Sequence, residues 1–430
     1  MLDRTTPPSI QSVSLTFHKP TKRILRNGTP VHIMKASELG AIRIDFVFSV
    51  GQYQQARNLQ ANFTCRMLRE GCRGYTAAEF AERLDYYGAW HELNTAINRT
   101  FVTLYTLKKH FSATMELVHR MLTEPIYNEE QLRIVCDNNK AHFLINLQKG
   151  NFLAMRNLRH SIYGDNHPCG VQTRPEDFDT LQVEDIVNFH HHYYGSSTCQ
   201  IYLSGEVDEE QLSCVESLFG NEKWGASEVD NESTIQKIHL PISPNIHPTP
   251  INIKLDGAVQ ESIHMGCLLM DVNSPDYLSM RVLTAVLGGY FGSRLMKNIR
   301  EEKGYTYHIG ADLMTNTSQV MFIIHCEAQI GKSEEIINEI HREMYRLQTE
   351  LIPDDELCMV RNYMIGEFCR NYESAFALSD AYIFLEHFGL PVTHLEDTIN
   401  SIHATDASRL QQLAQQYLRP ENLHCVVVHS

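Results

Sequence analysis

An internal repeat constrains the fold of this chain more than any other feature of its sequence. Residues 116–132 (ELVHRMLTEPIYNEEQL) match residues 338–357 (NEIHREMYRLQTELIPDDEL), each copy with an amphipathic helical pattern followed by an acidic cluster that opens a second helix. Residues 183–205 match residues 406–428 in the same way, with a helical pattern that ends at a tyrosine before a β-rich run. Both pairs are about 223 positions apart. Separate segments that agree on one offset predict a duplicated structural unit.

The repeat predicts two homologous α+β domains, each with a mainly antiparallel sheet packed against helices. The length of 430 residues suits two domains rather than one. We expect the first domain over residues 1–218, a linker over 219–248 and the second domain over 249–430. The linker interval is rich in Asn, Ser, Pro and charged residues, which is typical of a connecting segment.

Hydrophobic periodicity assigns the main elements of both halves. Strands are expected at residues 41–50, 99–107, 251–255, 262–269 and 318–329, and helices at 75–89, 274–289 and 333–349. Thr76 and Glu79 form the pattern of a capping box at the first of these helices, and Ser274 is the expected cap of the second.

Charge and cysteine usage narrow the possible partners and the compartment. A net charge of −15 argues against nucleic acid as the main partner. The eleven cysteines are scattered and form no CxxC pair, which favours a reducing compartment over a disulfide framework or a zinc ribbon. The beginning of the chain lacks the apolar run of a signal peptide, and no stretch has the apolar length of a membrane span. We therefore expect a cytoplasmic protein without a membrane partner.

One segment of the second half carries a recognisable motif. Residues 288–307 read GGYFGSRLMKNIREEKGYTY. The segment resembles the C-terminal half of the pitrilysin/insulinase-like zinc peptidases, in which a glycine-rich turn, SRL and an LRE-type segment precede a tyrosine seven residues after the arginine. Arg300 and Tyr307 stand at that spacing. The segments 75–89 and 162–170 also fall where the family has similar sequences. The resemblance therefore implies that two halves close like a clam shell around a substrate.

The helix that corresponds to the metal site of the family lacks its ligands. The family carries HxxEH there, with two zinc-binding histidines, a general-base glutamate and a third ligand about 76 residues downstream. The resemblance places Asn62, Cys65 and Arg66 on the first three positions and His142 near the fourth. An amide is a poor zinc ligand, and an arginine stays protonated. Cys65 and His142 beside a fixed positive charge would make only a weak site. We expect no metal and no cofactor in this chain.

The resemblance also implies roles for residues that lie outside the metal helix. In the family, the arginine and tyrosine hold the substrate and stabilise the oxyanion formed during peptide hydrolysis, the roles expected of Arg300 and Tyr307. The alternative is that Arg300 is a solvated helix end and Tyr307 a strand residue packed on the core. Residues 88–95 fall where the family offers a sheet edge to a peptide, and Trp90, His91 and Glu92 are the candidate contacts. An ordinary edge strand is the alternative there.

Together these features predict the non-metal subunit of a heteromeric zinc metalloendopeptidase. Such a subunit is inactive alone and lends Arg300 and Tyr307 in trans to a homologous partner that carries HxxEH and zinc, with a peptide as substrate. A catalytically inactive structural or peptide-binding homologue is the alternative. Asn62, Cys65 and Arg66 oppose a third possibility, a self-sufficient zinc peptidase.

Overall fold

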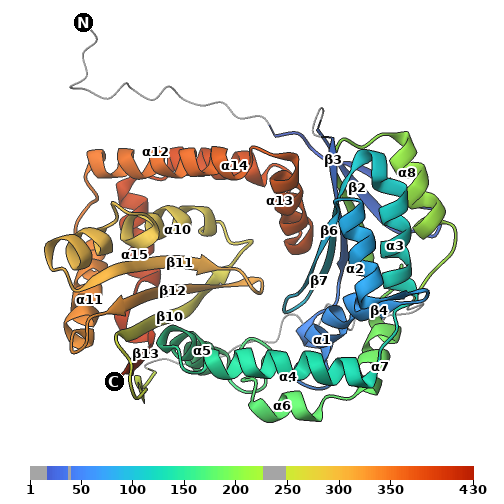
Figure 1. Cartoon of the computed structure of the whole chain (residues 1–430). Helices are drawn as coiled ribbons and strands as arrows, with labels where there is room; N and C mark the ends of the chain where they lie inside the picture. Colours follow the sequence, from blue (N-terminus) through green and yellow to red (C-terminus); the bar gives the residue numbers. More distant parts are fainter. Residues whose placement is uncertain (1–16, 37–39, 226–247) are drawn as a thin grey trace, which may run out of the picture.

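Two β-sheets form the framework of the protein in the computed structural model, which describes residues 17–36, 40–225 and 248–430 (Figure 1). The first sheet has the order β1-β2-β8-β3-β7-β6, and the second has the order β11-β12-β10-β13-β9. Their strands are β1 Thr21–Ile24, β2 Pro30–Lys35, β3 Ala41–Phe48, β6 Trp90–Thr95, β7 Thr100–Leu107, β8 Cys199–Gly205, β9 Ile251–Lys254, β10 Glu261–Asp271, β11 Thr306–Met314, β12 Gln319–Ala328 and β13 His424–His429. A small hairpin joins β4 Gly71–Cys72 to β5 Tyr75–Thr76.

Helices cover both sheets. They are α1 Gln60–Met67, α2 Ala77–Tyr86, α3 Phe111–Thr123, α4 Glu129–Asn146, α5 Gly150–Tyr163, α6 Pro175–Thr180, α7 Val183–Tyr193, α8 Glu209–Val215, α10 Tyr277–Thr284, α11 Ser333–Thr349, α12 Asp354–Asn371, α13 Ala375–Phe388, α14 His394–Ala404 and α15 Ala407–Tyr417. Parallel pairing is confined to β2 with β8 and β9 with β13 among the described strands, and the other neighbours are antiparallel. The predicted α+β fold with mainly antiparallel sheets is thus confirmed.

The local capping predictions have different outcomes. Thr76 Oγ1 accepts the N–H of Glu79 at 3.3 Å, and the Glu79 carboxylate accepts the N–H of Thr76. This capping box is therefore confirmed. Ser274 does not cap a helix directly, because α10 begins only at Tyr277. Ser274 Oγ instead accepts the N–H of Asp276 at 3.3 Å, within the turn that precedes the helix. No helix in the described part of the chain combines the length and apolar content that a membrane span needs.

Each half of the chain contributes one helix to the sheet of the other half. Helix α5 packs on β10 and β13 of the second sheet, while α13 packs on β8 and β2 of the first (Figure 1). Leu158 of α5 is buried among Ile323 and Val428, and Ile383 of α13 is buried against Tyr202. The two helices begin 225 positions apart, so the exchange follows the repeat. The halves are consequently interlocked rather than joined only by a connecting segment.

The packing of the first half extends beyond residue 218. Trp224 meets the rings of Phe48 and Phe219, and Gly195 pairs with Gly225. Most of the expected linker, residues 226–247, lies outside the described residues, as does the start of the first domain at residues 1–16.

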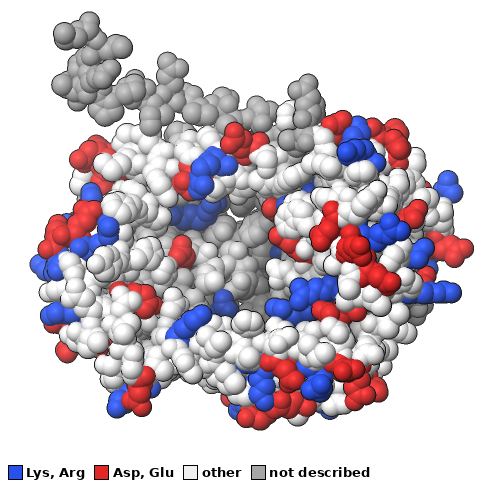
Figure 2. Space-filling view, viewed as in Figure 1, with Lys and Arg blue, Asp and Glu red and all other residues white. Residues whose placement is uncertain are grey.

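A hollow opens between the two halves, and Figure 2 shows acidic and basic side chains interspersed around it. Residues of the first sheet and the end of α13 line a cavity of about 690 Å³ between the halves. An ion cluster with two buried members, Arg43 and Asp45, joins α13 to the first half. Arg43 Nη2 donates to Asp45 Oδ1 at 2.9 Å, and Arg43 Nη1 donates to Asp380 Oδ2 of α13 at 3.0 Å. Thr103 Oγ1 also donates to Asp45 Oδ1, at 2.6 Å.

The contact between α13 and the first half predicts a pH dependence of stability. His387 Nε2 lies 2.9 Å from Asn98 Nδ2, and burial together with the nearby Arg99 lowers the pKa of His387 to about 3. Between about pH 6.5, the ordinary histidine pKa, and pH 3, the unfolded state therefore binds more protons at this residue than the folded state. The contribution of neutral His387 to the free energy of unfolding is complete above about pH 6.5 and is lost as the pH falls. We expect wild type to lose on the order of 1–2 kcal/mol more than His387→Gln between pH 7.5 and 5. Urea unfolding at the two pH values measures this difference, and equal losses would refute it.

Candidate functional site

The motif segment forms a short helix, a tight turn and the start of β11. Residues Met296–Glu302 form a π-helical segment that ends before Gly304, whose φ is +66°. A left-handed residue at this point turns the chain back sharply, which glycine does without strain. The Tyr305 N–H then donates to the Ile299 carbonyl at 3.0 Å. Arg300 and Tyr307 are therefore placed on the two sides of one closed turn.

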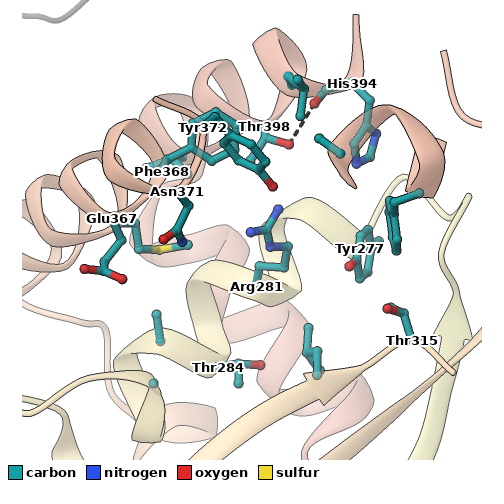
Figure 3. A pocket seen from close by; sticks show the side chains of 18 of the residues that line it. Tyr277, Arg281, Thr284, Thr315, Glu367, Phe368, Asn371, Tyr372, His394 and Thr398 are labelled. Carbon is teal, nitrogen blue, oxygen red and sulfur yellow. Dashed lines mark hydrogen bonds between the residues drawn. The ribbon is translucent and has the colours of Figure 1, made fainter. Parts of the chain in front are cut away.

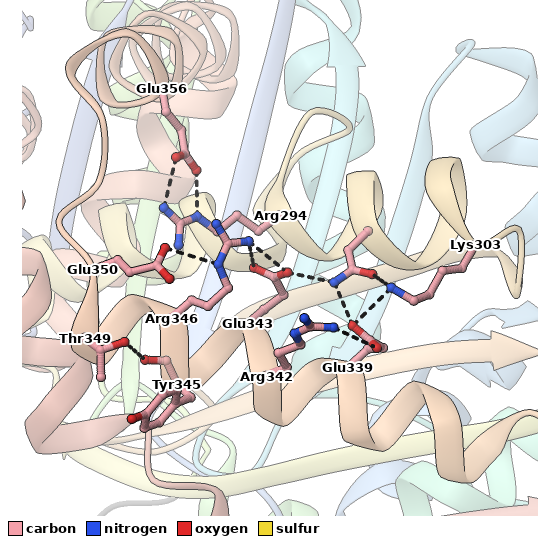
Figure 4. Close-up of polar contacts among 11 residues, drawn as sticks. Arg294, Lys303, Glu339, Arg342, Glu343, Tyr345, Arg346, Thr349, Glu350 and Glu356 are labelled. Carbon is pink, nitrogen blue, oxygen red and sulfur yellow. Dashed lines mark hydrogen bonds and ion pairs between the residues drawn. The ribbon is translucent and has the colours of Figure 1, made fainter.

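A polar network fixes one face of this segment to α11 and α12, as Figure 4 shows. The contacts are Arg294–Glu356 (2.8 and 3.0 Å), Asn298–Glu343 (2.7 Å), Asn298–Glu339 (3.0 Å) and Lys303–Glu339 (3.2 Å). Arg294, Asn298 and Glu343 are buried, so the bond between Asn298 and Glu343 is protected from water. Charge-assisted bonds of this kind hold geometry well when both partners are buried. The network orders the segment without using Arg300.

Arg300 keeps its hydrogen-bonding capacity free. Its guanidinium carbon lies 4.4 Å above the centre of the Phe291 ring, a cation–π contact. Within the described residues the Arg300 side chain has no hydrogen bond and no carboxylate partner. An aromatic ring orients the planar guanidinium while leaving its N–H donors available. The geometry differs from that of a solvated helix-end arginine, because the side chain is half-buried and held by the Phe291 ring.

A β-bulge directs Tyr307 away from the core. Thr306 pairs with Ala328 and His308 pairs with Glu327, which leaves Tyr307 as the extra residue. Thr306 Oγ1 accepts the His308 N–H at 3.0 Å and donates to the Glu327 carbonyl at 2.6 Å, which closes the bulge. The Tyr307 side chain is 86% exposed. A bulge commonly re-aims a side chain beside a functional site, and here it excludes packing of Tyr307 in the core.

The four degenerate metal positions lie in three different environments. On α1, Arg66 Nε donates to Asn62 Oδ1 at 2.6 Å, so these two side chains bind each other. Cys65 is 1% exposed in the core, and burial raises the pKa of its thiol to about 11. His142 is exposed on α4. Among the described residues, no group of three or more His, Cys, Asp or Glu side chains is arranged to hold a metal ion.

Cysteine reactivity gives a direct test of these environments. All eleven cysteines are free, and Cys358 is the exposed one, Cys214 and Cys369 are half-buried, and the other eight are buried. Because the thiolate is the reactive form, a buried thiol with a raised pKa reacts slowly. We expect Ellman's reagent at pH 8 to modify Cys358 first and Cys65 only after unfolding in urea. Mass spectrometry of peptides from a time course identifies the modified residues, and early labelling of Cys65 would contradict its burial.

The candidate peptide-binding strand forms the edge of the first sheet. Among the described strands, β6 pairs with β7 alone, so its other edge is free of sheet partners. Trp90 is 51% exposed and stacks on Tyr105 at a centroid distance of 3.9 Å. His91 is half-buried against Phe80, and Glu92 is exposed. Helix α1 packs beside this strand, with Thr95 Oγ1 3.4 Å from a carbonyl of α1.

Comparison with known proteins shows which family this chain is similar to. Residues 180–364 match the family model described as the Peptidase M16 inactive domain. The uncharacterized zinc protease YmxG of Bacillus subtilis is 20% identical over 91% of this chain and 94% of its own. The non-peptidase homologue YmxG of Helicobacter pylori is 19% identical over 86% of this chain and 84% of its own. The chain is thus similar to members of the M16 peptidase family, and residues 180–364 match its inactive domain. The predicted resemblance to pitrilysin/insulinase-like peptidases is thereby confirmed.

Solved structures show the same M16 fold. The peptidase M16 inactive domain from Pseudomonas fluorescens superposes with a TM-score of 0.83 at 19% identity, covering 95% of this chain and 98% of that one. A protease from Helicobacter pylori gives a TM-score of 0.81 at 17% identity, covering 96% of this chain and all of that one.

Several features of this M16 homologue were missing from the sequence prediction. The bulge at Tyr307, the aromatic ring beneath Arg300 and the network through Arg294 and Asn298 were not expected. Arg294 and Asn298 are four residues apart, a spacing that places both side chains on one face of a helix. The sequence therefore contained a signal for this part of the network. Within the described residues, no hydrogen bond, ion pair or ring contact joins Arg300 or Tyr307 to α1.

Proposed function

We propose that this M16 homologue is the non-metal subunit of a heteromeric zinc metalloendopeptidase and lends Arg300 and Tyr307 in trans. The observation that carries the proposal is the free Arg300 guanidinium, ordered by Phe291, beside an exposed Tyr307 on the same closed turn. An oriented cation and a neutral O–H donor are the groups that stabilise a developing oxyanion. A purely structural segment would gain stability by pairing the arginine with a carboxylate.

The geometry of α1 supports the absence of zinc from this chain. A metal ion at this face would meet the permanent positive charge of Arg66, and the Asn62 oxygen already accepts a bond from that arginine. The thiol of Cys65 faces the core. We therefore place the zinc in a homologous partner with an intact HxxEH helix, where it would activate the attacking water. Arg300 and Tyr307 of this chain would bind the peptide carbonyl and its oxyanion.

The first half provides a surface for the peptide. The free edge of β6 has unpaired backbone groups of the kind that an extended peptide bonds by β-augmentation. Trp90, stacked flat on Tyr105, presents a rigid apolar face, and the exposed Glu92 adds a negative charge beside it. His91 is turned partly inward and contributes less contact area.

A comparison of the isolated chain with its complex tests the proposal. The tagged protein is purified from its native cells, partners are identified by mass spectrometry, and zinc content and endopeptidase activity are measured for each fraction. We expect the isolated chain to hydrolyse no peptide even with added zinc, and the complex with an HxxEH-bearing homologue to be active and zinc-dependent. Activity of the isolated chain, or a complex that stays inactive, would overturn the proposal.

A catalytically inactive structural or peptide-binding homologue is the second candidate. The relative from Helicobacter pylori is described as a non-peptidase homologue, and this description supports the second candidate function. In that case Arg300 and Tyr307 take no part in hydrolysis, and the isolated chain binds extended peptides at β6 without cleaving them.

A further inference from the structure

The second half encloses a cavity that is separate from the Arg300–Tyr307 turn. It has a volume of about 660 Å³ and lies between α10, β11, α12, α13 and α14 (Figure 3). This volume is within the range that holds small-molecule ligands. Helices α4 and α12 begin 225 positions apart, so the repeat relates α12 to the helix that carries His142, and Glu367 is the counterpart of His142. The cavity thus lies beside the position in the second half that corresponds to His142 in the first.

Arg281 of α10 is a cation without a partner in this cavity. Figure 3 shows its side chain rising from α10 into the middle of the space. Within the described residues the half-buried Arg281 makes no hydrogen bond and no ion pair. His394 on the cavity wall does not add a second charge at neutral pH, because burial and the positive charge of Arg281 lower its pKa. A guanidinium removed from bulk water without a carboxylate is costly, which favours an anionic ligand.

The carboxylates that line the cavity are each engaged elsewhere. Asp312 lies 3.0 Å from His325, Glu367 lies 2.7 Å from Arg370, and Asp380 is bound by Arg43 of the first half. These carboxylates are therefore not free to neutralise Arg281, although they line the same cavity. Their partners also reduce the negative potential that an incoming anion would meet.

Two further polar groups share the cavity with Arg281. Asn371 and Tyr372 line it from the end of α12, and Tyr372 is directed toward its middle in Figure 3. Neither side chain makes a hydrogen bond with another described residue. Together with Arg281 they supply N–H and O–H donors, the set that binds a carboxylate. Apolar side chains form part of the remaining wall, among them Phe368, Phe384, Leu395 and Ile402.

We propose that this cavity binds a carboxylate that carries an apolar body, with Arg281 as the anchoring cation and Asn371 and Tyr372 as secondary donors. The carboxylate belongs either to a free small acid or to the C-terminus of a peptide. The proposal is independent of the function assigned to Arg300 and Tyr307.

Binding of matched acids and amides by the full chain tests the proposal. Saturation-transfer NMR titrations use 3-phenylpropanoate and 3-phenylpropanamide as one pair, and Ala-Ala-Phe with a free or an amidated C-terminus as the other. We expect at least one acid to bind roughly tenfold or more tightly than its amide, since a hydrogen bond to a charged group is worth that factor. Preference for the small acid identifies a metabolite site, and preference for the peptide acid a C-terminus site. Equal binding of acid and amide in both pairs, or no binding of either acid, would overturn the proposal.

Variants assign the binding to the cavity. Arg281→Leu should lower the affinity for the preferred acid about tenfold or more, and Tyr372→Phe should lower it less. Arg342→Leu, which changes an exposed arginine of α11, is the control and should leave this affinity unchanged. Circular dichroism establishes that each variant is folded. If Arg281→Leu does not fold, Arg281→Lys keeps the charge without the fork and should bind the acid more weakly than wild type. Acid binding that is unchanged in the arginine variants would refute the assignment.

Discussion

Changing Tyr307 to Phe is expected to lower kcat of the reconstituted peptidase complex about a hundredfold while leaving its assembly intact. The change removes one hydroxyl from a side chain that is 86% exposed and makes no hydrogen bond within the described residues. The stability of the subunit should therefore not change. Loss of a single oxyanion donor commonly costs a factor of about 10²–10³ in kcat. Steady-state kinetics on a peptide substrate, with gel filtration of the complex, measure both quantities.

Tyr345→Phe is the matched control for this experiment. Tyr345 is also exposed, lies on α11 of the same half and donates no side-chain hydrogen bond within the described residues. Its loss should leave activity unchanged. A fall in kcat with little change in KM would identify Tyr307 as a group that acts in the transition state. If Tyr307→Phe and the control are equally active, Tyr307 has no catalytic role, and the inactive binding homologue becomes the better description.

Changing Arg43 to Met is expected to destabilise the protein by about 3–5 kcal/mol. Asp45 is completely buried and would lose the cation that compensates its charge, while α13 would lose the bond from Arg43 to Asp380. Removing one partner of a buried ion pair leaves the other charge desolvated and unpaired, which is the source of the cost. The free energy of unfolding in urea measures the loss, and hydrogen exchange should show faster opening of α13.

Two further variants separate charge burial from general damage. Arg23→Met breaks an exposed pair with Glu209 and should leave the free energy of unfolding nearly unchanged. Adding Asp45→Asn to Arg43→Met removes the uncompensated charge while keeping an oxygen for the hydroxyl of Thr103, and should recover part of the stability. If the double variant is no more stable than Arg43→Met, the buried charge is not the cause of the loss.

The sequence by itself determined the duplication, most of the regular elements and the chemistry that α1 lacks. Helix α11 begins at Ser333 and ends at Thr349 as predicted, because its apolar periodicity is a local property of the chain. The side chains at Asn62, Cys65 and Arg66 could be judged as metal ligands from their types alone. The spacing of Arg300 and Tyr307 likewise pointed to one segment without any knowledge of its surroundings.

Only the tertiary structure decided which surfaces meet. Periodicity shows that α5 and α13 have apolar faces, but it does not show that each packs on the sheet of the other half. The bulge at Tyr307 depends on the register between β11 and β12. The N–H donors of Arg281 are free because the nearby carboxylates Asp312 and Glu367 pair with other side chains. Such features arise from contacts between residues far apart in the chain, and local propensity carries no information about the partner that each group finds.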